Sequence, residues 1–313
     1  MNLIICHTPL QVLIAEKIME KFPNEDFYGV MFTYASYHNQ KFQHYWQRFS
    51  EKCAKSELFI YPQAGRFSLF SALYQFNKKF PQRQFNNIFV ASIDDLFVQT
   101  FISQLQFNLL CTFDDGTANI VQNSIYYQDS SQSIVRKMAN LVLGNKYSTQ
   151  KLRQLSQKHY SIYPNMPNIV ENIELVSLSN SVEQNSAKFS EKPPLALLLG
   201  QPLYEDNQQN IALVERVVEQ FGIELYLPHP RESFKTDKVK YIETPLIFED
   251  YISQQSQQQK YRIYTYFSGA VLNVLNNPNI EVISIKPNLT NPTYLACYPI
   301  FEKFRVKVIE LDK

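Results

Sequence analysis

His229 stands between Pro228 and Pro230 in the stretch "LYLPHPRESF", directly after an alternating apolar run. Proline fixes its own φ and favours extended geometry in the residue before it, so the two prolines restrict the backbone on both sides of the imidazole. A histidine held in this way has either a structural or a chemical role, and an imidazole can help to hold a phosphate. It could equally cap a backbone carbonyl, and the local sequence leaves both roles open.

Polar residues follow two other strand-like runs in the second half of the chain. In "LLLGQPLYED", Gly200 ends the run, and Glu205 and Asp206 precede the next helical pattern. The missing side chain of Gly200 would let a ligand approach the backbone, and the two carboxylates would lie close to the same ligand site. In "YTYFSGAVL", Ser268 and Gly269 begin a helical pattern, where N–H groups and a hydroxyl suit a phosphate. Ser268 could also be an ordinary helix cap.

The first half of the chain places His7 after one strand-like run and Asp114 and Asp115 after another. The aspartate pair of "TFDDGTANI" could bind a divalent metal, because Mg²⁺ and Mn²⁺ prefer carboxylate oxygens. Aspartate early in a turn and glycine at its end are also ordinary turn chemistry. The residues alone do not decide between these two interpretations.

The segments that must position these side chains alternate between strand-like and helix-like patterns. Strand-like runs such as "NLIIC", "DFYGVMFTY" and "LALLLG" are separated by helix-like runs such as "VLIAEKIMEKF" and "NIALVERVVEQFG". This alternation is typical of an α/β protein with a parallel sheet covered on both faces. The carboxyl ends of parallel strands share one edge, where open α/β sheets bind ligands. We therefore expect the polar residues that follow the strands to gather at such edges.

The alternation stops between residues 156 and 192, where the sequence becomes polar and rich in serine and asparagine. This segment predicts a linker between a first domain, residues 1–155, and a second domain, residues 193–313. Each domain predicts a Rossmann-like parallel sheet. Two such domains facing each other would form a cleft for a ligand.

Composition narrows the possible functions. The 313 residues carry a net charge of +1, which gives no long-range field for attracting DNA or RNA, so no nucleic-acid partner is expected. The seven glycines form neither GxGxxG nor a P-loop pattern, which argues against dinucleotide and Walker-type sites. No apolar run reaches the length of about 18 residues that suggests a membrane span. The four cysteines show no CxxC spacing, as expected for reduced thiols in the cytoplasm.

The sequence contains, in order, "NLIICHTPLQVLIAEKIM", "FDDGTANIVQNSIYY", "LPHPRESF", "FEDYI" and "YTYFSGAVL". Together these stretches resemble the bacterial lipooligosaccharide sialyltransferases of the Pasteurella, Haemophilus and Neisseria type. The resemblance implies a GT-B fold, CMP-sialic acid as donor and a galactose-terminated glycan as acceptor. It also implies inverting transfer without a metal or other cofactor, and it favours an α-2,3 linkage.

The resemblance implies roles for individual residues as well. Sialyl transfer displaces CMP from the anomeric carbon while an acceptor hydroxyl attacks the opposite face. The family's HP histidine stabilises the departing phosphate, which corresponds to His229 with Pro230 beside it. The serine of the family's FSG turn contacts the same phosphate, which corresponds to Ser268, followed by Gly269. Glu249 of "FEDYI" would lie near the ribose, although an acidic residue there could simply complement a helix dipole.

The general base is less well defined by the resemblance. The family carries an aspartate directly after the proline that follows the strand glycine, whereas this chain has Leu203 in that place. A shift of two or three residues would bring Glu205 or Asp206 into the role. We expect Asp206 to be the base, with Glu205 as the next candidate.

Residues of the first domain are the remaining candidates. The resemblance places "FDDGTANI" on the acceptor-side wall, so Asp114 and Asp115 would contact the acceptor. Should neither carboxylate of the second domain reach the acceptor, the base would come from Asp114, Asp115 or His7.

Two rival functions stay open on the sequence. One is a glycosyltransferase with another nucleotide-sugar donor, such as a UDP-hexose, and the other is a non-catalytic protein that binds a nucleotide or a glycan. The departure at Leu203 keeps both open. We expect a cytoplasmic location, and the sequence leaves open peripheral association with the inner face of the inner membrane and a homodimer.

Overall fold

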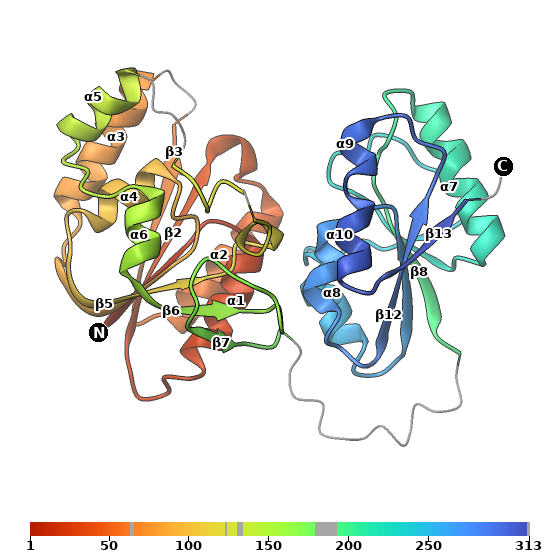
Figure 1. The fold of residues 1–313 in the computed structure, drawn as a ribbon, viewed down its shortest axis with the longest axis horizontal. Helices are drawn as coiled ribbons and strands as arrows, with labels where there is room; N and C mark the ends of the chain where they lie inside the picture. Colours follow the sequence, from red (N-terminus) through yellow and green to blue (C-terminus); the bar gives the residue numbers. More distant parts are fainter. Residues whose placement is uncertain (63–65, 123, 130–133, 179–192, 312–313) are drawn as a thin grey trace. The chain divides into compact units, whose positions relative to one another are not determined.

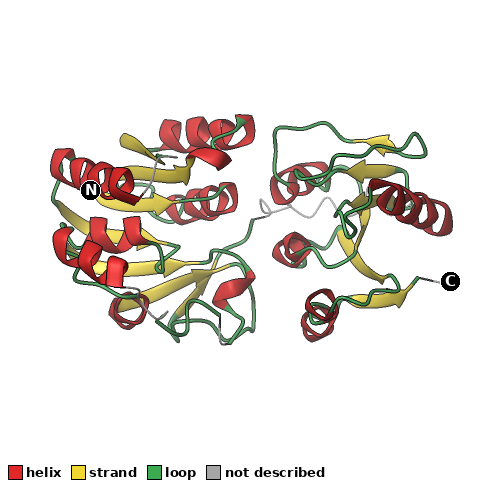
Figure 2. Cartoon of the chain, turned by 90° about the horizontal axis from the view of Figure 1, so that it is seen from above, coloured by secondary structure: helices red, strands yellow, loops and turns green. Residues whose placement is uncertain are grey.

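The computed structural model describes residues 1–62, 66–122, 124–129, 134–178 and 193–311. The chain divides into two compact units, Met1–Ser177 and Leu178–Lys313 (Figure 1). Each unit is a parallel sheet with helices on both of its faces (Figure 2).

The first unit contains a seven-stranded sheet in the order β3-β2-β1-β4-β5-β6-β7. Its pairings are all parallel, and the first strands are apolar on both faces because helices cover both. The strands are β1 (Asn2–Cys6), β2 (Phe27–Tyr34), β3 (Lys55–Tyr61), β4 (Gln84–Val90), β5 (Gln106–Phe113), β6 (Ser156–Ser161) and β7 (Ile173–Leu175).

The helices of the first unit begin at recognisable caps. Thr8 caps the first helix by accepting from the N–H of Gln11, and Pro9 occupies its first turn. Asn39 and Asp95 cap two later helices in the same way. The helices are α1 (Pro9–Met19), α2 (Gln40–Lys52), α3 (Arg66–Lys79), α4 (Leu96–Ile102), α5 (Ile134–Val142) and α6 (Thr149–Leu155), with the 3₁₀ turns η1 (Ala35–Tyr37) and η2 (Thr117–Asn119).

The second unit contains a six-stranded parallel sheet in the order β10-β9-β8-β11-β12-β13. When its strands are renumbered from one, this order is 3-2-1-4-5-6, the Rossmann order, and the first six strands of the other sheet have it too. The strands are β8 (Leu195–Leu199), β9 (Leu225–Leu227), β10 (Lys240–Tyr241), β11 (Tyr261–Thr265), β12 (Ile280–Lys286) and β13 (Lys307–Glu310).

The helices of the second unit follow the same pattern of crossovers. Asp206 caps the longest of them, and Gly222 ends it with a φ of 61°, a left-handed geometry that favours glycine. The helices are α7 (Asn207–Phe221), α8 (Phe248–Gln255), α9 (Pro292–Leu295) and α10 (Tyr298–Lys303), with the 3₁₀ helix η4 (Gly269–Val274).

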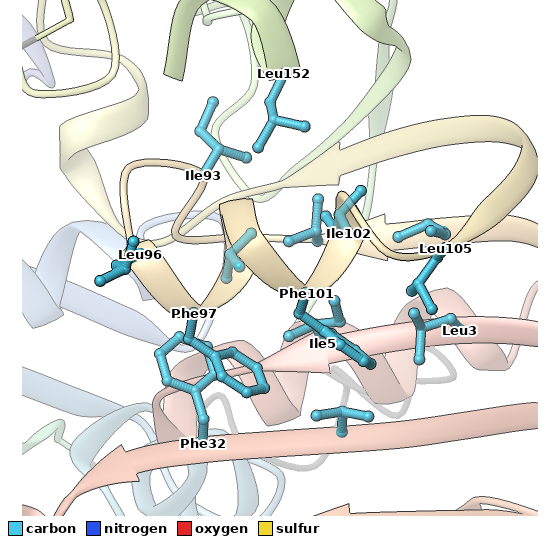
Figure 3. Packing of buried hydrophobic residues seen from close by; sticks show 14 of the residues in the cluster. Leu3, Ile5, Phe32, Ile93, Leu96, Phe97, Phe101, Ile102, Leu105 and Leu152 are labelled. Carbon is cyan, nitrogen blue, oxygen red and sulfur yellow. The ribbon is translucent and has the colours of Figure 1, made fainter. Parts of the chain in front are cut away.

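Aromatic rings fill much of the first core. Phe97 and Phe101 of α4 reach the sheet, where they meet Phe32, Ile5 and Leu3 (Figure 3). The ring centroids of Phe32 and Phe97 are 4.7 Å apart. Burying such a side chain contributes about 1.5–3 kcal/mol, so this layer stabilises β1, the strand that His7 follows, and its neighbour β2.

The boundary of the first unit differs from the prediction. Residues 156–161 and 173–175, predicted as linker, form β6 and β7 of the first sheet. The strand β6 was missed because some of its polar residues point into the protein interior. Ser156 and His159 are buried, and the Thr112 hydroxyl bonds Ser156 at 2.9 Å and Nδ1 of His159 at 2.8 Å. The rest of the predicted linker, residues 179–192, lies outside the described residues.

Asp114 joins β5 to β6, and this corrects its predicted position on an acceptor-facing wall. The side chain is fully buried. One oxygen accepts from Nε2 of His159 at 2.8 Å and from Asn168 at 3.0 Å, and the other accepts from the Ser161 hydroxyl and the Ile162 N–H, both at 2.7 Å. Both oxygens are saturated inside the protein, so Asp114 stabilises the sheet and neither faces the acceptor nor presents a metal ligand.

The described residues include no helix that is long and apolar enough to cross a membrane.

Replacing Asp114 by alanine should lower the free energy of unfolding of the first unit by about 3–5 kcal/mol, because it leaves the buried donors without an acceptor. Denaturant unfolding followed by circular dichroism measures the change. Asp26→Ala, at an exposed aspartate of the same unit, serves as the control. A loss in Asp114→Ala no greater than in the control would contradict the structural role.

Candidate active site

Three of the predicted residues lie at one edge of the second sheet. Gly200 follows β8, His229 follows β9, and Ser268 follows β11. The strand β8 is paired with β9 on one side and β11 on the other, so the three loops leave neighbouring strands. Chain order reverses about β8, and such a switch point is where open α/β sheets bind ligands.

His229 is held in one tautomer by its own loop. The N–H of Arg231 donates to Nδ1 of His229 at 3.1 Å. Because Nδ1 accepts, the proton of the neutral ring lies on Nε2, which can donate to a ligand. Burial and the nearby Arg231 guanidinium lower the pKa of the imidazole below its usual value. The neutral ring, which presents one N–H, is therefore favoured at neutral pH.

Gly200 has a different role from the one predicted. A Cβ at this position would lie 2.5 Å from the Tyr226 hydroxyl and 2.9 Å from a carboxylate oxygen of Glu232. The space that was predicted to admit a ligand is filled by these two side chains. The glycine is required by this close approach, so Gly200 acts on the site through Tyr226 and Glu232.

Ser268 and Gly269 begin a shorter helix than the sequence predicted. The helix η4 is a six-residue 3₁₀ helix, so its dipole is weaker than that of a full α-helix. The N–H of Ser268 is bonded to the Thr265 hydroxyl at 3.2 Å, and that of Phe267 to Gln201 at 3.0 Å. The Ser268 hydroxyl makes no capping bond and Gly269 is exposed, which leaves a hydroxyl and a backbone N–H for a phosphate.

The two predicted base residues, Glu205 and Asp206, lie in the loop after β8 and are exposed. Asp206 accepts from the N–H of Gln208 at 2.9 Å as the cap of α7. Asn207, next to it, exchanges hydrogen bonds of 3.3 Å with Ser233, four residues beyond His229. The loop with the carboxylates is thereby tied to the loop with the imidazole.

Leu203 occupies the position at which the resemblance predicted a carboxylate. Its side chain is 8% exposed and belongs to the second hydrophobic core. A charge buried at this position would need a partner to offset the loss of its hydration. The first exposed carboxylates after it are those of Glu205 and Asp206.

Glu249 is a buried link between α8 and η4. Its carboxylate accepts from the Asn273 amide at 2.7 Å, and both side chains are more than nine-tenths buried. The predicted contact with a ribose stays a prediction. The observed bond links α8 to η4, the helix that begins at Gly269.

The switch point of the first sheet carries a polar network. Asp115 accepts from the Gln11 amide, the Ser92 hydroxyl and the Tyr126 hydroxyl, and Gln11 also donates to Ser92 at 2.9 Å. Ser92 has a φ of 48°, unusual for a residue with a side chain. Gln11, Ser92 and Tyr126 were missed by the sequence reasoning. The signal for Gln11 was a polar residue on the apolar side of a helix.

His7 lies beside this network with the opposite tautomer to His229. Its Nδ1 bonds the carbonyl oxygen of Phe32 at 2.9 Å, and the ring stacks on Phe32 at 4.5 Å. Since a carbonyl only accepts, Nδ1 donates, and Nε2 of the neutral ring is an acceptor. His7 can thus accept a hydrogen bond or a proton from a hydroxyl.

Asp94 is a further carboxylate at this edge that the sequence reasoning missed. Burial raises its pKa to about 6, and the neighbouring Asp95 and Asp115 add to the shift. A carboxyl with such a pKa suits proton transfer near neutral pH. The signal was present in "ASIDDLF", which repeats the strand-then-DD pattern of "TFDDG".

A pocket of about 440 Å³ opens where β12 and β13 end. The Lys286 amine and a Glu310 carboxylate oxygen form an ion pair of 3.1 Å in its lining. None of the predicted site residues contributes to it. The lining residues are Lys286, Pro287, Asn288, Leu289, Leu295, Glu310 and Leu311.

Residues 24–289 match glycosyltransferase family 52. The chain belongs to this family. As a family 52 glycosyltransferase it is an enzyme, which removes the non-catalytic alternative. Over 99% of both chains it is 49% identical to a Pasteurella multocida protein named CMP-N-acetylneuraminate:beta-galactoside alpha-2,3-sialyltransferase. Over 96% of both chains it is 36% identical to a Haemophilus influenzae N-acetyllactosaminide alpha-2,3-sialyltransferase. The predicted family is confirmed.

Solved structures confirm the GT-B fold of this glycosyltransferase. Arabidopsis thaliana UGT89C1 complexed with UDP-L-rhamnose is 11% identical and superposes with a TM-score of 0.54, over 99% of this chain and 85% of that one. A UDP-N-acetylglucosamine 2-epimerase superposes with a TM-score of 0.51 at 13% identity, over 100% of this chain and 84% of that one. At these identities the likeness concerns the fold alone.

Gly200→Ala should destabilise the second unit of the glycosyltransferase by about 1–3 kcal/mol, because the added methyl group displaces Tyr226 or Glu232. Denaturant unfolding measures the loss. If Gly200 instead served only to admit a ligand, the variant would be as stable as the wild type, and only its affinity for CMP would fall.

The His229 ring should titrate below its ordinary value of about 6.5, since burial and Arg231 disfavour the charged form. Proton NMR of the histidine rings measures the pKa, and His229→Ala assigns the signal. Arg231→Ala keeps the backbone donor to Nδ1 and removes the like charge, so the pKa should rise. A His229 pKa above 6.5 in the wild type would contradict this description.

Proposed function

We propose that this glycosyltransferase transfers sialic acid from CMP-sialic acid to a terminal galactose, with inversion and an α-2,3 linkage. The observation that carries the proposal is the 49% identity, over 99% of both chains, to the Pasteurella multocida protein named as a CMP-N-acetylneuraminate:beta-galactoside alpha-2,3-sialyltransferase. The acceptor would be a lipooligosaccharide or a related glycan. A lipid-linked acceptor would place the cytoplasmic enzyme at the inner face of the inner membrane.

The geometry of His229 supports a phosphate leaving group. As the bond between the anomeric carbon and the phosphate oxygen breaks, its electron pair stays on CMP and the phosphate gains negative charge. The Nε2–H of His229 can donate to that oxygen without giving up its proton. A donor already aimed where charge develops stabilises the transition state more than the ground state.

The acceptor hydroxyl must lose its proton as the new bond to the anomeric carbon forms. In this proposal the carboxylate of Asp206 takes the proton, with Glu205 as the next candidate. The capping bond of Asp206 uses one oxygen, so the second oxygen can serve as the base. Asp115 and His7 would line the acceptor side, and His7 or Asp94 would supply the base if neither Asp206 nor Glu205 does.

The donor would be held by the other residues of the second unit. The Ser268 hydroxyl and the Gly269 N–H would contact the phosphate, and Pro230 would restrict the His229 loop beside it. Glu249 would face the ribose hydroxyls. In this proposal these donors, rather than a metal, stabilise the departing phosphate, and the transfer is metal-independent.

Turnover of CMP-sialic acid with lactose in the presence of a chelator should release CMP from the wild type. His229→Ala should lower kcat by about a hundredfold or more, because the leaving phosphate loses its hydrogen-bond donor. Asp206→Asn should lower kcat by a similar factor of about a hundred, since asparagine caps a helix as well as aspartate does but cannot accept the proton.

The matched comparison for Asp206 is Glu205→Gln, and thermal unfolding shows whether each variant is folded. Full activity of Asp206→Asn with a loss in Glu205→Gln would transfer the role to Glu205. Full activity of both would move the base to the first unit, where His7→Ala and Asp94→Asn come next. No CMP release by the wild type, followed by turnover of a UDP-hexose, would overturn the proposed donor.

A further inference from the structure

Glu232 follows the histidine loop and is not explained by the proposed chemistry. It lies three residues after His229 and is half-buried. One carboxylate oxygen, Oε2, accepts from the Tyr226 hydroxyl at 2.7 Å and from the N–H of His229 at 3.4 Å. The backbone N–H of Glu232 donates to the carbonyl of His229 at 2.9 Å. Both backbone polar groups of the histidine are therefore bonded to Glu232.

The other oxygen of Glu232, Oε1, lowers the stability of this arrangement. Oε1 is buried and, within the described residues, has no hydrogen-bond partner. A buried acceptor without a donor costs about 1–3 kcal/mol. Such a group is uncommon in a folded protein and calls for an explanation at that site.

The surroundings of Glu232 are arranged to keep the carboxylate in place. Tyr226, whose ring is fully buried, rises from β9 to donate to it. Gly200 lies at the end of β8 and has no side chain. A Cβ there would lie 2.9 Å from Oε2 of Glu232, which is too close. Two neighbouring strands thus supply a donor and an empty space for one carboxylate.

We propose that Glu232 is the positioning residue of His229: anchored by Tyr226 and admitted by Gly200, it fixes the histidine backbone so that Nε2 is aimed at the leaving group. Pro228 and Pro230 restrict the backbone dihedral angles on both sides of His229, but they cannot fix the position of the loop relative to the sheet. The bonds to Glu232 do so, and Arg231 then sets the tautomer through Nδ1. The inference rests on the proposed function of His229 as the donor to a phosphate.

A double-mutant cycle tests the inference. Glu232→Ala should lower kcat by about ten- to a hundredfold with a smaller change in KM, because a misplacement of 1 Å can cost about a hundredfold in rate. Glu232→Gln keeps an acceptor oxygen and should recover most of the loss. In the His229→Ala background, Glu232→Ala should cause no further loss, since there is no imidazole left to position.

The control is Glu219→Ala, at an exposed carboxylate of α7, which should leave kcat unchanged in both backgrounds. An equal loss from Glu232→Ala with and without His229 would overturn the inference and assign Glu232 a general structural role. Unchanged kcat in Glu232→Ala would also overturn it. Thermal unfolding identifies variants that do not fold, and for those Tyr226→Phe, which removes only the anchoring donor, completes the cycle.

Failure of the proposed function is distinguishable from failure of the inference. If the wild type releases no CMP from CMP-sialic acid, the donor is wrong, and the positioning role is then measured without substrate. The NMR signals of the His229 ring should move in Glu232→Ala and stay in place in Glu219→Ala. An unmoved His229 signal in Glu232→Ala would overturn the inference whatever the donor is.

Discussion

Every strand pairing in the described ranges of the chain is parallel, and this constraint decides where chemistry can occur. Parallel neighbours cannot be joined by a tight turn, so each connection leaves the carboxyl edge and returns through a crossover. The loops that leave a strand therefore collect at one edge of each sheet. In the second unit these loops hold Gly200, His229 and Ser268, and in the first unit they hold His7, Ser92 and Asp115.

The two edge histidines show how the backbone assigns opposite chemistry to one side chain. In His229 the Nδ1 accepts from the N–H of Arg231, so Nε2 is a donor. In His7 the Nδ1 donates to the carbonyl of Phe32, so Nε2 is an acceptor. Transfer of a glycosyl group needs a donor at the leaving oxygen and an acceptor at the attacking hydroxyl. The sequence shows two histidines after two strands, and only the hydrogen bonds of Nδ1 distinguish their abilities.

The regular strands and helices could be predicted because their apolar residues recur at the spacing of a strand or a helix. Runs such as "NLIIC", "DFYGVMFTY" and "LALLLG" became β1, β2 and β8. The strand β6 could not be found in this way, because Ser156, His159 and Ser161 are buried in it. Their hydrogen-bond partners, Thr112 at the end of β5 and Asp114 directly after it, come more than forty residues earlier. Periodicity reports burial of apolar groups, and it is silent about polar groups that are paired by the fold.

The same limit applied within the site. His229 could be found because the prolines beside it in the sequence mark it. The role of Gly200 was predicted wrongly because its neighbours, Tyr226 and Glu232, are distant in sequence and are brought to it by the pairing of β8 with β9. Asp114 and Asp115 are adjacent in sequence, yet one is saturated inside the sheet and the other faces the switch point. Successive residues of an extended segment point to opposite sides, so a DD pair after a strand divides between the interior and the site.

Asp114 and Glu232 together separate the stabilising and the functional use of a buried carboxylate. Asp114 receives four donors on its two oxygens and leaves no buried atom unpaired. Among the residues that the structure describes, Oε1 of Glu232 has no hydrogen-bond partner, a cost that an apolar side chain would not carry. An apolar side chain would, however, take the acceptor away from the buried Tyr226 hydroxyl and from the His229 N–H. The carboxylate of Glu232 provides the acceptor that holds the Tyr226 hydroxyl and the histidine N–H at once. On the inference drawn above, the protein tolerates the lower stability caused by Oε1 because the carboxylate positions the imidazole for catalysis.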